Sequence, residues 1–134
     1  MSVLFSQYLS YLAYGRAYHK RQIAYVYLPS LYLMLINGFK DDYDSFAYYI
    51  LYVYFHEYFH LRNKWLLGKW GYSEKNIHKM ATRLVKELLK DNEFRKEWLE
   101  MFNDLDTEPS PYHEEFMSES MKRLSNRGRK KKET

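Results

Sequence analysis

The residues best suited to chemistry lie in one short segment of this sequence, His56-Glu57-Tyr58-Phe59-His60. On a helix, its H-E-x-x-H spacing puts the two imidazoles on one face, one turn apart, where both can bind a single Zn²⁺ ion. The glutamate between them could serve as the base for water activated by the metal. The segment is therefore a candidate metallohydrolase site, with Glu57 as the catalytic residue and His56 and His60 as metal ligands.

A zinc site of this kind needs a third protein ligand. Glu74 is the best candidate because it begins the helix expected next along the chain, and His78 and Glu87 follow it in order of preference. With these residues the arrangement resembles the gluzincin class of metallopeptidases, and the resemblance implies a small zinc-dependent hydrolase or peptidase.

The alternative is that this segment has only a packing role in the fold and binds no metal. Arg62 interrupts the apolar flank expected of such a helix, and a helix rich in Tyr, Phe and His can show the pattern by composition alone. We therefore expect that the protein is not an enzyme. It should have no catalytic residue, no cofactor and no stoichiometric zinc. The zinc hydrolase, with Glu57 as base and His56, His60 and Glu74 as ligands, is kept as the alternative.

Two basic segments, one near each end of the sequence, form a second candidate site. Asp41 is the first acidic residue, although the 134-residue chain has a formal charge of only +4. Cations interleaved with tyrosines can neutralise phosphates while the rings pack, but a solvated face or a localisation signal would look the same. The expected nucleic-acid-binding residues are Arg16, His19, Lys20, Arg21, Lys40, Arg127, Arg129, Lys130, Lys131 and Lys132.

The elements that hold these residues are expected to be helices. From Leu4 to Phe39 apolar residues recur every seven positions, and Pro29 interrupts them, which favours two helices or one kinked helix. The run 23–28 could instead be a strand, because periodicity alone does not settle a short apolar run. Further helices are expected from about Tyr43 to Trp65 or Gly68, from Ser73 through Leu88, from Asp91 or Asn92 to Leu105, and from Tyr112 to about Leu124.

These elements predict an all-α fold. It comprises a basic, Tyr-rich, kinked helical arm over residues 1–40, a four-helix-bundle-like domain over 41–124 and a basic tail over 125–134. No uncharged stretch reaches the roughly 20 apolar residues of a spanning helix, so we expect no transmembrane segment. The absence of cysteine excludes disulfides and thiolate metal sites, and 15 tyrosines favour contacts between subunits.

Four features carry a resemblance to a second family. They are the segment Phe5-Ser6-Gln7-Tyr8, the basic and aromatic run from Arg16 to Tyr27, the Pro29-Ser30 break, and the helical pattern from Asp42 to Leu124. This layout resembles the major coat proteins of archaeal filamentous viruses, the rudivirus and lipothrixvirus group. The resemblance implies coat dimers, of one chain or of two paralogous subunits, double-stranded DNA held in A-form, and a filament that can carry a lipid envelope.

The expected function is therefore that of a structural nucleoprotein. As the coat subunit of a helical virion, the chain would wrap and package double-stranded DNA without sequence specificity, using its basic segments for phosphates and its aromatic faces for other copies. Its expected location is the virion, and the host cytoplasm during assembly.

Overall fold

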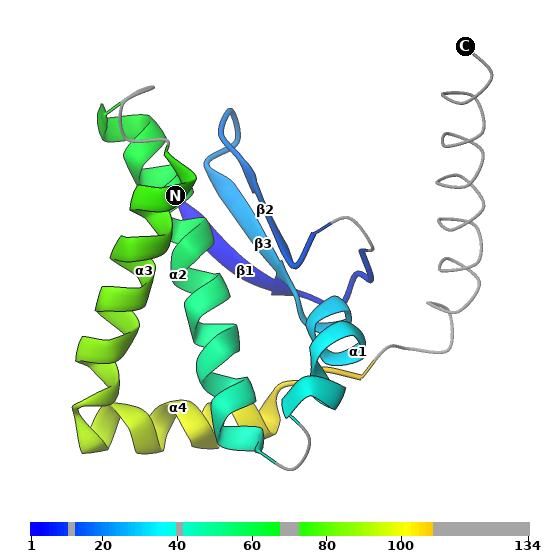
Figure 1. Cartoon of the computed structure of the whole chain (residues 1–134). Helices are drawn as coiled ribbons and strands as arrows, with labels where there is room; N and C mark the ends of the chain where they lie inside the picture. The colour runs from blue at the N-terminus through cyan, green and yellow to red at the C-terminus, as the bar shows by residue number, and fades with distance from the viewer. Residues whose placement is uncertain (11–12, 40–41, 68–72, 109–134) are drawn as a thin grey trace, which may run out of the picture.

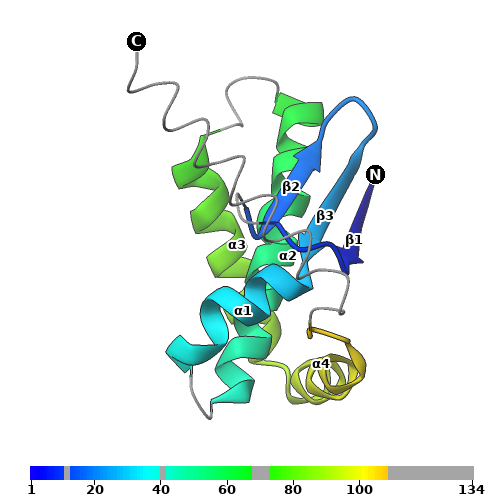
Figure 2. The same ribbon diagram turned by 90° about the vertical axis from the view of Figure 1, so that its right-hand side faces the viewer.

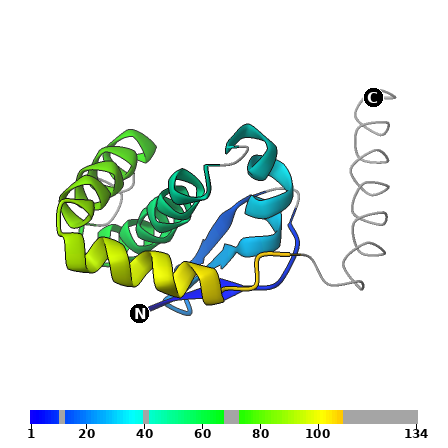
Figure 3. The same ribbon diagram turned by 90° about the horizontal axis from the view of Figure 1, so that it is seen from below.

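A computed structural model describes residues 1–10, 13–39, 42–67 and 73–108 of the chain. Three strands precede four helices in these residues: β1 (Ser2–Ser6), β2 (Gly15–Tyr18), β3 (Ile23–Tyr27), α1 (Leu28–Phe39), α2 (Tyr43–Leu67), α3 (Glu74–Leu89) and α4 (Asn92–Asp104). The sheet and α3 lie on opposite sides of α2, and α4 crosses below them (Figures 1 and 3).

The expectation of an all-α fold with a helical arm over residues 1–40 is wrong. Strand β3 lies at the centre of a three-stranded sheet, parallel to β1 and antiparallel to β2. Ala24 and Val26 are fully buried while Tyr25 between them is half-buried, which is the alternation of a strand with one covered face. The alternative interpretation of residues 23–28 as a strand is confirmed for Ile23–Tyr27.

Pro29 begins a helix and does not kink one. It lies in the first turn of α1, where a helix does not use the backbone N–H that proline lacks. The neighbouring Ser30 is buried, and its hydroxyl accepts a hydrogen bond from the Ser10 backbone N–H at 2.6 Å. This contact ties the loop after β1 to the start of α1.

The helices expected after residue 42 are confirmed as far as the structure describes the chain. Asp42 precedes α2 and accepts hydrogen bonds from the backbone and hydroxyl of Ser45, which lower the pKa of its carboxyl group. Ser73 takes the N-cap position of α3 without a side-chain cap. The helix expected over 112–124 and the tail over 125–134 lie outside the described residues.

The described helices share their main core with the sheet, and a second, smaller cluster of Phe59, Ile77 and Ala81 lies between α2 and α3 alone. Helix α2 contacts all six other described elements, including each strand of the sheet. Trp98 of α4 is buried in the same core, and its indole N–H donates to the Ala47 carbonyl of α2 at 2.8 Å. Among the described helices, none is long and apolar enough to cross a membrane, as expected.

Asp91 caps the N-terminus of α4. Its carboxylate accepts hydrogen bonds from the backbone N–H groups of Glu93 at 2.9 Å and Phe94 at 3.3 Å. We expect Asp91→Ala to lower the free energy of unfolding by about 1 kcal/mol, because these donors lose their cap. Asp91→Asn keeps an acceptor and should lie close to wild type in urea denaturation. Equal losses in both variants would contradict a capping role.

Candidate metal centre

Helices α2 and α3 bring three metal-ligating side chains together. Helix α3 runs back along α2, so that its first residue, Glu74, lies beside the histidines of α2 (Figure 1). The Glu74 carboxylate is 3.2 Å from His56 Nε2 and 3.0 Å from His60 Nε2 through its two oxygens. The two imidazole rings, one helical turn apart, have centroids 4.7 Å from each other. The predicted grouping of His56, His60 and Glu74 is thus present in the fold.

The donor set fits zinc. The ligand atoms of the three residues all lie within 4.8 Å of one another. Zn²⁺ prefers imidazole nitrogen and carboxylate oxygen at about 2.0–2.2 Å, which in a tetrahedral site puts donor atoms roughly 3.3 Å apart. Small side-chain rotations therefore suffice to close the donors around one ion. Three protein ligands leave a fourth position open, and the Glu74 side chain is 73% exposed, so solvent reaches this edge of the cluster.

The two histidines differ in their readiness to coordinate. Burial lowers the pKa of His60, and the acidic groups nearby do not reverse this, so its ring is neutral at pH 7. Burial also acts against the charged form of His56, but hydrogen bonding to Glu57 and the negative charges of Glu57 and Glu74 outweigh it and raise the pKa of His56. A metal ion would thus compete with the proton on His56.

Glu57 lies beside this cluster and packs against strand β2 of the sheet. The residue is only 6% exposed, and its Oε1 is 3.4 Å from His56 Nδ1. It packs directly on Gly15 of β2, where a Cβ atom would come within 2.7 Å of Glu57 Cγ and 3.0 Å of its Oε1. Glycine at this position therefore gives the carboxylate the space it occupies between α2 and β2.

A small hollow opens onto Glu57. Its volume is about 250 Å³, and the residues that line it are Tyr14, Gly15, Tyr49, Tyr52, Val53, His56 and Glu57. Burial raises the pKa of both Tyr49 and Tyr52, so these walls stay uncharged at neutral pH. The hollow adjoins the cluster on the Glu57 side of His56, and neither His60 nor Glu74 lines it.

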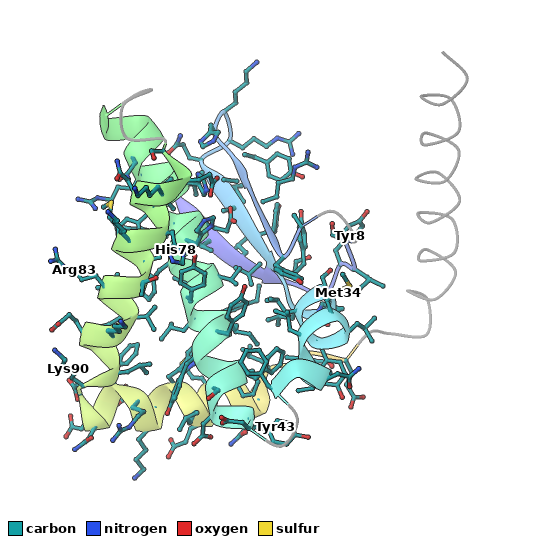
Figure 4. All side chains as sticks on the ribbon, in the orientation of Figure 1. Tyr8, Met34, Tyr43, His78, Arg83 and Lys90 are labelled. Carbon is teal, nitrogen blue, oxygen red and sulfur yellow. The ribbon has the colours of Figure 1, made fainter. Side chains whose placement is uncertain are left out.

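The other two candidates for the third ligand lie elsewhere. The Nδ1 atom of His78, one turn further along α3, is 2.5 Å from the Tyr52 hydroxyl (Figure 4). Glu87 lies further along α3, where its carboxylate accepts a hydrogen bond from Lys90 at 3.0 Å. Of the three candidates, Glu74 alone joins the two histidines within the described residues.

Of the described basic residues predicted to bind nucleic acid, His19 lies near enough to the cluster that, besides burial, its charge helps to lower the pKa of His60. Arg16 on β2 and Lys20 and Arg21 in the following turn are exposed, whereas His19 is half-buried. Gln22 closes this turn with a φ of 54°, and its side chain donates to the His19 carbonyl at 2.7 Å. Lys40 and the five predicted cations between 127 and 132 lie outside the described residues.

The hollow is the part of the site that the sequence analysis missed. Its walls come from segments more than 30 positions apart, and only the pairing of the sheet brings Tyr14 and Gly15 to α2. One signal was available in the sequence. A glycine within a strand often marks the close approach of another group, and Gly15 begins β2 between Tyr14 and Arg16.

Neither a protein-family model, nor a curated protein, nor a solved structure matches this chain. The class of protein must therefore be argued from its own site.

Proposed function

We propose that this protein is a small zinc-dependent hydrolase, most simply a peptidase. The observation that carries the proposal is the position of Glu74, whose two carboxylate oxygens lie 3.2 and 3.0 Å from the Nε2 atoms of His56 and His60. This juxtaposition joins residues from two helices, so local composition, which can produce an H-E-x-x-H pattern by itself, does not explain it. The geometry therefore favours the zinc alternative over the expectation that no metal is bound.

The side chains divide the chemistry between them. His56, His60 and Glu74 would hold zinc, which when bound supplies a Lewis acid that activates water and polarises a carbonyl group. Glu57 would take a proton from the attacking water and return it to the leaving group. The burial of Glu57 against Gly15 keeps its carboxylate in one place and limits its contact with bulk solvent.

The hollow supports an acyl substrate with an apolar part. Its lining includes three tyrosines and a valine, together with the ionisable side chains of His56 and Glu57. Binding pockets commonly combine apolar walls with a few polar groups that orient the ligand. An amide bond beside an apolar side chain fits this arrangement, as does the position of the H-E-x-x-H segment on a helix.

The coat-protein hypothesis depended on an N-terminal helical arm. Where the helical arm was expected to wrap DNA, the segments Ser2–Ser6, Gly15–Tyr18 and Ile23–Tyr27 form a sheet packed on α2. Binding of double-stranded DNA, assembly with other copies and a place in a virion remain predictions from the sequence.

Zinc content tests the proposal. Protein purified without a His tag or chelator, and dialysed against zinc and then against buffer, should hold about one zinc ion per chain by elemental analysis. We expect His60→Ala and Glu74→Gln to lower this content strongly, because each removes one of three ligands. His78→Gln is the matched control, since His78 lies one turn from Glu74 and outside the cluster. A wild-type protein that takes up no zinc, or equal uptake by all four proteins, would contradict the proposed site.

A further inference from the structure

The outer face of the sheet carries tyrosine and arginine side chains. Ala24 and Val26 turn one face toward α2, so the alternate residues of all three strands point the other way. In register on this outer face, Tyr25 of β3 pairs with Leu4 of β1 on one side and Arg16 of β2 on the other. Figure 2 looks onto this side of the sheet, with α2 and α3 behind it.

Four tyrosines surround one arginine here. Ring centroids are 6.0 Å apart for Tyr18 and Tyr25, 6.5 Å for the stacked pair Tyr25 and Tyr27, and 5.6 Å for Tyr8 and Tyr27. The guanidinium carbon of Arg16 lies 5.9 Å from the centroid of the Tyr18 ring. These five residues, with Ser6 and Ser10, line a hollow of about 340 Å³. We call this set of seven residues the tyrosine face.

Two of the four rings are open, whereas Tyr25 is half-buried and Tyr27 is only 7% exposed. Tyr8 is 45% and Tyr18 is 38% exposed. Figure 4 places Tyr8 on the far side of the sheet from His78. The neighbouring turn adds the exposed cations Lys20 and Arg21, and the first 40 residues contain no carboxylate side chain. Open aromatic rings, serine and tyrosine hydroxyls and positive charge without acidic groups therefore occur together.

We propose that the tyrosine face binds single-stranded nucleic acid. Unpaired bases stack on aromatic side chains, and cations beside the rings neutralise the phosphates that link the bases. A duplex keeps its base faces stacked inside and would offer the rings only its backbone and groove edges. An acidic peptide would satisfy Arg16, Lys20 and Arg21 but would leave the tyrosine rings without planar partners.

The exposed face of α3 is the obvious competitor for a polyanion. Lys75, Lys79, Arg83, Lys86 and Lys90 recur there at intervals of three or four residues, and all are exposed. Figure 4 shows Arg83 and Lys90 pointing away from the rest of the molecule. This stripe would attract any polyanion by charge. The hollow of about 620 Å³ beside it is lined by one imidazole ring, His78, and by the carboxylate of Glu87, but by no Tyr, Phe or Trp ring. Variants on the two surfaces separate the two modes of binding.

Fluorescence anisotropy with a labelled single-stranded oligonucleotide tests the rings. Tyr18→Ala should weaken binding roughly 5- to 150-fold, the loss of one base-stacking partner. Tyr18→Phe keeps the ring and should remain within about twofold of the wild-type dissociation constant. A duplex of the same sequence should bind more weakly than the single strand. Wild-type affinity in Tyr18→Ala, or equal loss in Tyr18→Phe, would overturn the proposal.

The salt dependence of binding tests the charge. Arg16→Gln should lower the slope of log affinity against log salt by about 0.7, the value for one phosphate contact on a single strand. Arg83→Gln removes the same charge from α3 and should leave the slope nearly unchanged. Both residues are exposed, so both variants should fold, and thermal melting checks this. A slope that falls in Arg83→Gln alone, or competition by poly-glutamate as strong as by the oligonucleotide, would overturn the proposal. None of these measurements depends on zinc or on hydrolysis.

Discussion

Glu57→Gln is expected to lower peptide hydrolysis by about 10²- to 10⁴-fold and to leave the zinc content unchanged. The amide has nearly the shape of the carboxylate, so it can remain against Gly15 in the space between α2 and β2. It cannot accept a proton at neutral pH, and the attacking water would lose its base. The separation of activity from metal content is what distinguishes a base from a ligand.

The measurement is hydrolysis of a quenched-fluorescent peptide library by zinc-loaded protein, with zinc content determined on the same samples. Glu97→Gln provides the matched control, because Glu97 is an exposed glutamate on α4 and lies outside the metal cluster. It should retain full activity. Wild-type rates in Glu57→Gln would exclude Glu57 as the base, and loss of zinc in that variant would make it a ligand.

The helices could be predicted because each has local signals. In α3, Ile77, Ala81 and Val85 recur every four residues, and these are the residues buried in the structure. Asp91 marks the start of α4 with its cap. Such signals lie within one or two turns of the chain, so a single sequence contains them.

The sheet could not be predicted in the same way, because its strands are short and its pairing is distant. Leu4, Tyr18 and Tyr25 recur at multiples of seven, which suggested one face of a helix. These residues do share a face, but it is the outer face of a sheet. Side chains alternate between the two faces within each strand, and this alternation starts afresh after each turn. Parallel pairing of β1 with β3 joins residues 21 positions apart and has no local signature.

The candidate site likewise contains one part with local sequence signals and another part that depends on the packing of distant segments. Glu74 was the preferred third ligand of the zinc alternative because it begins the helix after the H-E-x-x-H segment. A helix that returns along its predecessor brings its first turn beside the end of that helix. The contact of Glu57 with Gly15 depends on how β2 packs against α2, and local periodicity contains no information about it. The grouping of His56, His60 and Glu74 was thus predictable, whereas the residues that shape the space around Glu57 were not.

Gly15→Ala should reduce hydrolysis about 10²-fold without removing zinc, because it displaces the base rather than a ligand. The added methyl group would lie 2.7 Å from Glu57 Cγ and 3.0 Å from the backbone oxygen of Tyr25, so it has contacts on two sides. The Glu57 side chain would have to move, and a misplacement of about 1 Å in a catalytic group can cost about 10²-fold in rate.

Gly38→Ala is the matched control. A Cβ atom at Gly38, near the end of α1, would have no neighbour within 4 Å. This variant should keep wild-type activity and gain up to about 1 kcal/mol of stability, since alanine is the better helix former. Unfolding of both variants in urea separates a shifted side chain from a damaged fold.

A double-mutant cycle shows whether Gly15 acts through Glu57. In the Glu57→Gln background the base is already absent, so adding Gly15→Ala should lower the residual rate by only a few-fold, far less than in the wild-type background. Full additivity of the two losses would mean that Gly15 supports hydrolysis by another route, such as the shape of the hollow. Wild-type activity in Gly15→Ala would show that the close contact with Glu57 does not matter for the reaction. The cycle thus measures whether the position of the Glu57 carboxylate, set by a glycine on a distant strand, limits the rate.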